Sequence, residues 1–168
     1  MKKEMVKNEG MKKEVMNVVK KEFVDLGLSV KWANMNEGAK SVCENGKYFA
    51  WNEVKVDDEG RLPSESEMRE LIEKCNWTWD CFLLPVAQML LAPVYGYVVR
   101  SRVNGNAIFL PAAGLICGDK DYFDGEMGYY LTNTCKDNVG ACELLMSHKF
   151  YGMYLAGSYK RSVRLVKD

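Results

Sequence analysis

One stretch of this sequence carries a complete helix-start signal, and the segments around it favour strands. Ser64 precedes Glu67 by three residues, the spacing of a capping box, in which each side chain accepts a hydrogen bond from the other residue's backbone amide. Apolar side chains then recur at the i, i+3, i+4 and i+7 positions of one helix face: Met68, Leu71, Ile72 and Cys75. The sequence therefore predicts one helix within Arg61 to Cys75 whose apolar face packs inward.

Strand signals lie on both sides of this helix. Before it, Phe23 to Val30 leads into Lys31–Ala33, and Lys47–Trp51 is a second run rich in aromatic residues. After it, Trp77 and Trp79 flank a threonine, and strand alternation places both rings toward the core with the threonine at the surface. A single helix among several strands favours an α+β fold.

The carboxy-terminal half predicts a hairpin, a loop and three more strands. Asn104 and Gly105 favour the positive φ angles of a two-residue turn, so Val98 to Leu110 should form a β-hairpin. Residues 115–127 are rich in Asp and Gly and should form a loop. The remaining strands are expected at Tyr129 to Thr134, Tyr151 to Leu155 and Ser162 to Val166. In the last of these, Val163 and Leu165 should face the side opposite to Arg164 and Val166.

Five segments of the chain carry a further pattern in a fixed order. They are Leu26 to Ala33, Gly46 to Trp51, Arg61 to Glu65, Asn104 to Gly114 and Ser162 to Val166. In this order the segments resemble the Fibrobacter succinogenes major paralogous domain, a family common in Bacteroidetes. The Arg-Leu-Pro-Ser-x-x-Glu run that starts at Arg61 is similar to the Arg-Leu-Pro-Thr-x-x-Glu signature of that family. Because the five segments span nearly the whole chain after residue 21, we interpret residues 22–168 as one domain.

The resemblance implies a fold and a class of function. The family is similar to C-type-lectin-like and formylglycine-generating-enzyme-like folds, so we expect an α+β, C-type-lectin-like mixed fold. Its parts would be twisted antiparallel strands, a β-hairpin and one or two helices. Members of such folds mostly display variable loops for binding, which favours a non-enzymatic recognition or assembly module.

Charge and hydropathy exclude two classes of partner. The chain has 23 basic and 23 acidic residues, so its formal net charge is zero and no overall field attracts nucleic acid. The longest apolar stretch, Phe82 to Val94, contains two prolines and a glutamine and is too short to span a bilayer as a helix. We expect neither a nucleic-acid partner nor membrane insertion.

Two segments stand outside the common family pattern. Residues 1–21 form an amino-terminal arm whose second half has a helical apolar stripe, so the arm is either a frayed tail or a docking helix. It lacks the apolar region of a signal peptide, which favours a virion or cytoplasmic location, or the cell surface if a leader is missing. The apolar insertion at residues 80–95 either caps the domain's own core or forms an interface, and we favour an interface in an oligomer. Its expected contact residues are Phe82, Leu84, Met89 and Leu90.

Cysteines and carboxylates provide weaker candidates. Six cysteines without an export signal favour reduced, mostly buried thiols, and their spacing does not match a zinc site. Four carboxylates between Asp119 and Glu126 provide oxygen ligands that calcium prefers, but an ordinary acidic loop explains them better. We expect no metal and no cofactor.

Catalysis has two candidate arrangements, and neither is complete. Cys142 and His148 could form an activated thiolate, although no third orienting residue accompanies them. Cys135 and Cys142 could bind copper, as a cysteine pair does in formylglycine-generating enzymes, but their sequence surroundings do not match that pattern. We therefore expect no enzymatic activity, with a degenerate oxidase as the third hypothesis.

The predicted ligand surface lies in the carboxy-terminal part of the chain. The family's usual Gly-Tyr-Tyr-Trp-Ser-Ser-Thr run is changed here to Gly128 to Thr134, and the sequence diverges further downstream. In C-type-lectin-like folds this half carries ligand-facing residues. The candidates are Lys136, Asp137, Asn138, His148, Tyr151, Tyr154, Tyr159 and Lys160. Alternatively, Tyr151 and Tyr154 belong to the core and the others to a solvated loop.

Three hypotheses for function follow, and the third is the degenerate oxidase described above. The first is a phage virion component for attachment or decoration, with protein partners and a cell-surface glycan or protein as receptor. The second is a bacterial surface domain that binds glycans as an adhesin. The family's host range, the arm and the missing export signal favour the first by analogy.

Overall fold

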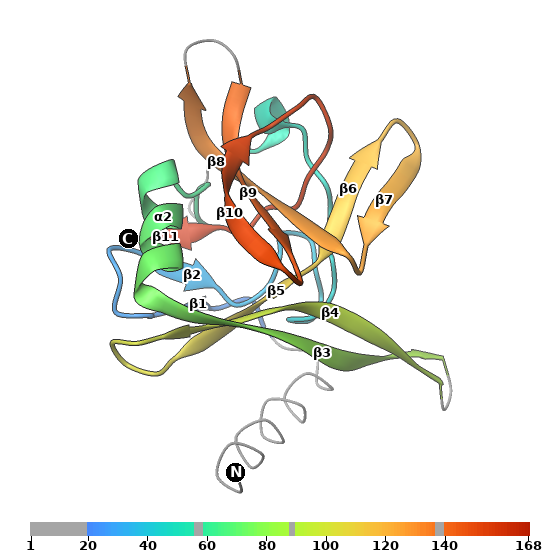
Figure 1. Ribbon diagram of the computed structural model, residues 1–168, viewed down its shortest axis with the longest axis horizontal. Coiled ribbons are helices and arrows are strands. Elements are labelled where there is room, and N and C mark those ends of the chain that lie inside the picture. The colour runs from blue at the N-terminus through green and yellow to red at the C-terminus, as the bar shows by residue number, and fades with distance from the viewer. Residues whose placement is uncertain (1–19, 56–58, 88–89, 137–139) are drawn as a thin grey trace, which may run out of the picture.

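The computed structural model describes residues 20–55, 59–87, 90–136 and 140–168. These residues form a mostly β structure with one α-helix, which is consistent with an α+β or a mostly β fold. Figure 1 shows the helix α2 beside a five-stranded sheet, with a long hairpin beneath both. Most of the amino-terminal arm lies outside the described residues, so its predicted docking helix stays a prediction.

The helix α2 (Glu65–Lys74) begins as the capping box predicts. The Ser64 hydroxyl accepts a hydrogen bond from the Glu67 amide at 3.1 Å, and the Glu67 carboxylate accepts one from the Ser64 amide at 2.8 Å. Arg61 precedes the helix, and its backbone forms a bridge with Val166. Met68 and Leu71 are buried, so the predicted inward face is confirmed while the helix starts four residues later than Arg61.

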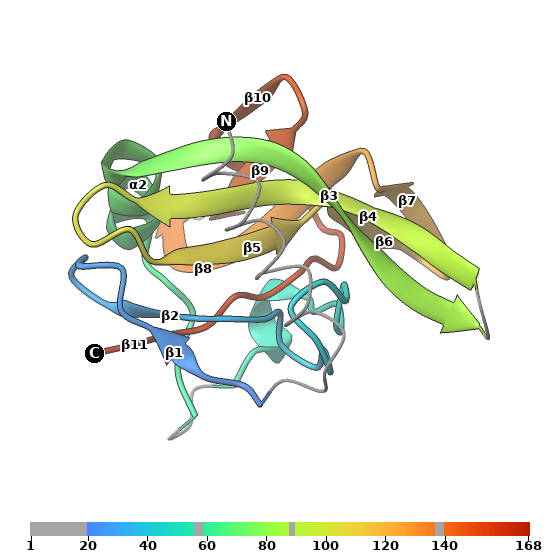
Figure 2. The same cartoon turned by 90° about the horizontal axis from the view of Figure 1, so that it is seen from below.

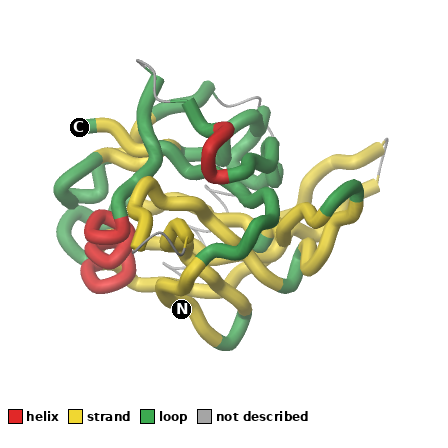
Figure 3. The backbone as a smooth tube through the Cα atoms, turned by 90° about the horizontal axis from the view of Figure 1, so that it is seen from above, coloured by secondary structure: helices red, strands yellow, loops and turns green. Residues whose placement is uncertain are grey.

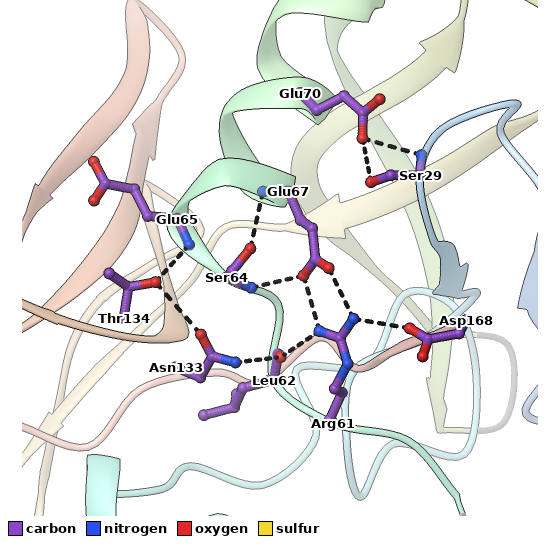
Figure 4. Close-up of polar contacts among 10 residues, drawn as sticks. All are labelled: Ser29, Arg61, Leu62, Ser64, Glu65, Glu67, Glu70, Asn133, Thr134 and Asp168. Carbon is purple, nitrogen blue, oxygen red and sulfur yellow. Dashed lines mark hydrogen bonds and ion pairs between the residues drawn. The ribbon is translucent and has the colours of Figure 1, made fainter.

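The helix start is tied to two distant parts of the chain. Figure 4 shows Arg61 donating two hydrogen bonds to the Glu67 carboxylate, at 2.9 and 2.8 Å, and one to Asp168 at 2.9 Å. Thr134 accepts a hydrogen bond from the Glu65 amide at 2.9 Å. The Arg-Leu-Pro-Ser-x-x-Glu signature is therefore a structural hub that fixes the helix and the carboxyl terminus.

One three-stranded sheet contains the predicted hairpin. Its strands are β3 (Cys75–Ala87), β4 (Leu90–Ser101) and β5 (Ala107–Pro111), all antiparallel. The predicted two-residue turn is wrong: the Ser101 amide bonds to the Asn106 carbonyl, so four residues separate these two, and only Gly105 among them has positive φ. The Ser101 hydroxyl favours this longer loop because it accepts hydrogen bonds from the Val103 and Asn104 amides.

The apolar insertion forms the outer half of the β3–β4 hairpin. The outer ends of β3–β4 and of the β6–β7 hairpin both project away from α2 (Figure 2; Figure 3). Phe82 is buried against Phe109, with ring centroids 4.6 Å apart, and Leu84 packs on the same cluster. Phe82 is therefore a core residue, which corrects the predicted interface. Met89 and the side chain of Leu90 lie outside the described part of the chain.

The five-stranded sheet has the order β10-β9-β8-β6-β7. Its strands are β6 (Ala113–Cys117), β7 (Lys120–Asp124), β8 (Met127–Lys136), β9 (Gly140–Ser147) and β10 (Phe150–Leu155). The expected loop at 115–127 is instead mostly the β6–β7 hairpin. Exposure of all five residues of β7 explains the polar composition that suggested a loop.

A third, small sheet joins the two ends of the domain. It contains β1 (Phe23–Val24), β2 (Lys31–Ala33) and β11 (Val166–Lys167). The expected strand at 47–51 is reduced to a bridge between Phe49 and Arg161, followed by the short 3-10 helix η1 (Trp51–Glu53).

The closing segment is buried on both sides. The predicted alternation holds, since Val163 and Leu165 pack in one core cluster and Val166 packs in another, and both faces of residues 161–166 are buried. Backbone hydrogen bonds explain this result, because Ala33 and Glu37 donate to one part of the segment and Leu131 donates to the carbonyl of Ser162. The segment passes between neighbours instead of lining an outer edge.

The largest core cluster lies between α2 and the sheets. Trp77 and Trp79 pack against it while Thr78 is exposed, as the sequence predicts. All six cysteines are free thiols. Cys43, Cys75 and Cys142 are buried, whereas Cys117 and Cys135 are exposed and Cys81 is intermediate, so only half match the predicted burial.

Candidate functional site

A long groove runs between the two projecting hairpins and continues toward the β9–β10 turn. Its wide part has a volume of about 730 Å³ and its narrow part about 420 Å³. Tyr95, Gly125 and Glu126 line both parts, so the two are continuous. We call it the Tyr95 groove, defined by residues 43–46, 79, 92–95, 124–127 and 147–149.

The wide part of the groove exists because β5 pairs with only part of β4. β5 pairs with β4 only from Gly96 to Arg100, and the Tyr95 carbonyl accepts the last hydrogen bond, from the Ala112 amide at 2.8 Å. Beyond this point the outer residues of β4 have no strand on that side within the described chain. The Tyr95 side chain is 41% exposed there, so its ring is available to a ligand.

The opposite wall is a loop that is held in place by hydrogen bonds. The Asn36 side chain donates to the Asn45 carbonyl at 2.9 Å, and the Asn45 side chain donates to the Asp124 carboxylate at 2.9 Å. Gly46 has φ +75°, and a Cβ there would lie 2.4 Å from the Glu37 carbonyl oxygen. The loop therefore has one defined conformation, and the wall is formed before any ligand binds.

Behind this wall lies a buried arginine. Arg164 donates to the Asn36 side-chain oxygen from Nε at 3.0 Å and from Nη2 at 2.7 Å. It also donates to the carbonyls of Ala33 and Phe109, while Tyr130 donates to that of Pro111. Burial lowers the pKa of Arg164 to about 10. The network joins the groove wall to the core through Asn36.

Aromatic packing forms the narrow end of the groove. The His148 and Trp79 rings lie edge to face with centroids 6.0 Å apart, and Trp79 meets Tyr97 at 5.1 Å. Tyr97 donates a hydrogen bond to the Ser147 carbonyl at 2.8 Å, which fixes the β9–β10 turn against β4. This end is consequently rigid, with exposed imidazole and lysine groups from His148 and Lys149.

Charges are distributed unevenly along the groove. Glu44, Asp124 and Glu126 provide carboxylates at the wide part and centre, and Lys149 provides a positive charge at the narrow end. Glu44 accepts a hydrogen bond from the Lys40 amide at 2.7 Å. Within the described residues the Glu126 carboxylate has no hydrogen bond or ion pair. It is therefore the acidic group most available to a ligand beside Tyr95.

The predicted ligand residues do not form one face. Lys136 ends β8 and pairs with the first residue of β9, whereas His148 follows the last residue of β9, so the two lie at opposite ends of this strand pair. Lys136 forms an ion pair with Glu65 at 3.2 Å. His148 lines the Tyr95 groove, whereas Lys160 lies elsewhere and forms an ion pair with Glu53 at 3.3 Å. Asp137 and Asn138 lie outside the described residues.

The predicted tyrosines also have separate surroundings. Tyr151 stacks on Trp77 with centroids 4.5 Å apart and an interplanar angle of 12°, so it partly covers the core. Tyr154 is 49% exposed and lies near Phe150. The Arg161 guanidinium lies 5.8 Å from the centroid of the Tyr159 ring. These three side chains therefore do not line the groove.

Several groove residues had no functional signal in the sequence. Tyr95 is the last residue of the apolar insertion and resembles one more hydrophobic residue, and Asn45 lies in a loop without a motif. Asp124 and Glu126 were recognised only as members of an acidic loop. The Asn45–Asp124 contact joins residues 79 positions apart, which no local pattern reveals.

The Cys142 and His148 arrangement is not assembled. Cys142 lies within β9 and His148 lies beyond its end, about 20 Å away along an extended strand. Burial raises the pKa of the Cys142 thiol, and Glu65, 3.4 Å away, raises it further, which disfavours a thiolate. The described residues contain no group of three or more His, Cys, Asp or Glu side chains positioned for a metal ion.

Two further observations concern relationships and membranes. No helix in the described ranges is both long enough and apolar enough to cross a membrane.

Searches of protein-family models, curated proteins and solved structures found no match to this chain. The family resemblance therefore stays a prediction that depends on the sequence segments alone.

Proposed function

We propose that this chain is a non-enzymatic recognition module that binds a saccharide in the Tyr95 groove. The observation that carries the proposal is the half-exposed Tyr95 ring beside the unpaired Glu126 carboxylate, in a groove with preformed walls. Sugar rings have apolar C–H faces that pack on aromatic rings, and hydroxyl groups that bond to carboxylate and amide groups. The Tyr95 groove offers both kinds of partner within one concave surface.

A saccharide fits this groove better than the other ligand classes. The mixture of three carboxylates with His148 and Lys149 gives no single-sign surface for a polyanion. Aromatic rings, from Tyr95 and Trp79, and polar groups line the same groove, which suits a ligand with many hydroxyls. Since the walls are held by hydrogen bonds, little conformational entropy is lost on binding.

The proposed fold type is C-type-lectin-like, as the family resemblance implies. Support comes from the hub of Arg61 and Glu67 that fixes the helix, and from Trp77 and Trp79 that pack beside it. In this proposal the recognition surface includes His148 from the predicted set but is centred on Tyr95.

Binding of the purified chain to a glycan array tests the proposal. We expect selected oligosaccharides to bind, and titration calorimetry with such a sugar should show roughly tenfold or greater weakening in Tyr95→Ala. Glu126→Gln should weaken binding less, because a neutral amide still bonds to hydroxyls. Tyr122→Ala is the matched control, since Tyr122 is similarly exposed, at 42%, but lies outside the groove.

Two results would contradict the proposal. One is an array on which no saccharide binds above background. The other is saccharide binding that Tyr95→Ala and Tyr122→Ala reduce equally, because that result would place the ligand elsewhere.

A second candidate is an assembly role as a virion component. The observation that favours it is the exposed apolar face at the outer end of the β3–β4 hairpin, where Leu83 is 53% and Leu91 51% exposed. An antibody against the chain should label purified phage particles if this candidate is correct. Particles that carry the gene but lack the protein would remove it.

A further inference from the structure

Within the described residues, the strand β10 is an open edge of the five-stranded sheet. Its sequence, Phe-Tyr-Gly-Met-Tyr-Leu, contains no charged residue and no proline. Phe150, Tyr151, Tyr154 and Leu155 are between 37% and 53% exposed. An uncharged, exposed, apolar edge strand is a template for pairing with another strand.

Two other edges of the larger sheets, β7 and β3, are protected. The opposite edge strand, β7, carries Lys120, Asp121 and Asp124, and it is kinked at Phe123, where φ is 62°. On β3 the Asp80 carboxylate accepts a hydrogen bond from the Cys81 amide at 2.7 Å, and Pro85 has no amide hydrogen to donate. Charge, kinks and proline are the features that prevent edge pairing, and β10 has none of them.

The direction of the free backbone groups on β10 follows from its pairing with β9. The Ala156 amide donates to the Ala141 carbonyl at 2.8 Å, in the same register that pairs Tyr154 with Glu143. Even-numbered residues therefore direct their backbone groups toward β9. By alternation, the amides and carbonyls of Tyr151, Met153 and Leu155 point away from the sheet.

We propose that β10 pairs antiparallel with β10 of a second copy of this chain, about a two-fold axis at Met153. An antiparallel edge is complementary to itself, so the same surface serves both subunits. Centring on Met153 matches all three outward-directed residues: Met153 faces the partner's Met153, and Tyr151 faces the partner's Leu155. The two five-stranded sheets then form one continuous sheet.

Side chains on the solvent face support this register. It places Tyr154 opposite the partner's Gly152, where the ring can cover the glycine backbone of the opposite strand. Glycine within a strand often marks a close approach of another backbone, and Gly152 has no turn or positive φ that requires it. With no charge between Phe150 and Leu155, no like charges oppose each other across the axis.

A second copy is therefore the partner that the strand itself specifies. This inference does not depend on the saccharide proposal, since β10 does not line the Tyr95 groove. It also places the self-association surface on β10 instead of on residues 80–95.

Sedimentation or light scattering of the full chain at several concentrations tests the proposal. We expect a concentration-dependent dimer. Met153→Pro removes an outward amide and leaves the β9 hydrogen bonds in place, so it should raise the dimer dissociation constant roughly tenfold or more. Tyr154→Lys changes an exposed side chain and should have a similar effect without affecting folding. Tyr122→Lys is the matched control, because it introduces the same charge at an exposed tyrosine on the protected β7 edge.

Amide hydrogen exchange gives an independent measurement. In the dimer, the amides of Tyr151, Met153 and Leu155 should exchange more slowly as concentration rises, while those of β7 should not. The proposal is overturned by a monomer at every concentration, or by a dimer that resists Tyr154→Lys. The proposal is also overturned if the amides of β10 and β7 gain equal protection from exchange as concentration rises. If Met153→Pro fails to fold, Tyr154→Lys and the exchange rates decide.

Discussion

Arg164 binds Asn36 through two hydrogen bonds to a single side-chain oxygen, at 3.0 and 2.7 Å, inside the domain. The other acceptors of this guanidinium are backbone carbonyls, and among the described residues no carboxylate forms an ion pair with it. Asn36 in turn holds the Asn45 carbonyl. A buried charge thus stabilises the wall of the Tyr95 groove through one neutral side chain.

Replacing Asn36 should destabilise the whole domain. Asn36→Leu leaves a buried guanidinium with fewer acceptors, and we expect the free energy of unfolding to fall by about 2–4 kcal/mol. Urea denaturation followed by tryptophan fluorescence measures this change. Asn76→Ala, at an exposed asparagine of β3, should change stability by less than about 0.5 kcal/mol. Equal effects of the two changes would contradict a structural role for the network.

Stability should fall at acid pH through Glu67. Its hydrogen bonds from Arg61, then from the Ser64 amide, hold the pKa of the Glu67 carboxyl below its usual value despite partial burial. Because the folded pKa is lower than the unfolded one, this stabilisation is present above about pH 4.3 and is lost as pH falls through the folded pKa.

Glu67→Gln tests this linkage. The variant should be less stable at neutral pH, and its stability should decrease less on acidification than that of the wild type. Thermal unfolding at several values between about pH 3 and pH 7, the range in which carboxyl groups titrate, would show the difference. Glu73→Gln, which makes the same change of residue at an exposed position of the same helix, is the control. A parallel pH profile for Glu67→Gln would refute the assignment.

The Asn45–Asp124 contact should control the shape of the groove. The Asn45 side-chain amide donates to the Asp124 carboxylate at the end of β7. Asn45→Asp replaces this contact with two carboxylates that repel each other, so the loop should separate from β7. We expect faster amide hydrogen exchange in residues 38–46 and weaker saccharide binding, with little change in global stability. Asn52→Asp adds the same charge at an exposed site outside the groove. Unchanged exchange in the loop would show that this contact does not hold the wall.

Tyr151 should contribute to stability more than to ligand binding. Its ring stacks on Trp77 and meets Tyr97 with centroids 5.3 Å apart. Tyr151→Ala should therefore lower the free energy of unfolding by about 1–3 kcal/mol, whereas Tyr151→Phe should be nearly neutral. Chemical denaturation and saccharide titration of both variants separate the roles. A loss of saccharide affinity at unchanged stability would restore Tyr151 as a ligand contact.

Thiol reactivity should divide the cysteines by exposure. Burial raises the pKa of Cys43 to about 12 and that of Cys75 to about 11, so both stay protonated at neutral pH. A chromogenic disulfide reagent should modify the exposed Cys117 and Cys135 quickly and the buried thiols only on unfolding. Mass spectrometry identifies the modified residues. Rapid labelling of Cys43 in the folded protein would contradict its burial.

Local signals in the sequence determined the helix and much of the hub. The Ser64–Glu67 pair and the spacing of Met68 and Leu71 act within two helical turns, so their outcome depends little on distant residues. The tryptophan strand and the existence of the β4–β5 hairpin followed for the same reason. The turn length did not, because the Ser101 hydroxyl added hydrogen bonds that the Asn-Gly pattern does not include.

Local sequence signals did not predict the candidate site. Among the predicted ligand residues that the structure describes, His148 alone lines the groove, and its role there depends on Tyr97 bonding to Ser147 across 50 positions. Exposure of Tyr95 depends on where β5 leaves β4. The burial of Phe82 depends on Phe109 lying opposite, which made an apparent interface residue part of the core.

Local sequence signals account for the capped helix, the strands and the hairpins, because neighbouring residues supply the caps and the periodicity. The open strand edges and the pairs of loops that face each other depend instead on how the whole chain packs. The physical reason is that the β10 edge and the Asn45–Asp124 contact arise from the packing of elements far apart in the chain. Such contacts form only when the whole core does.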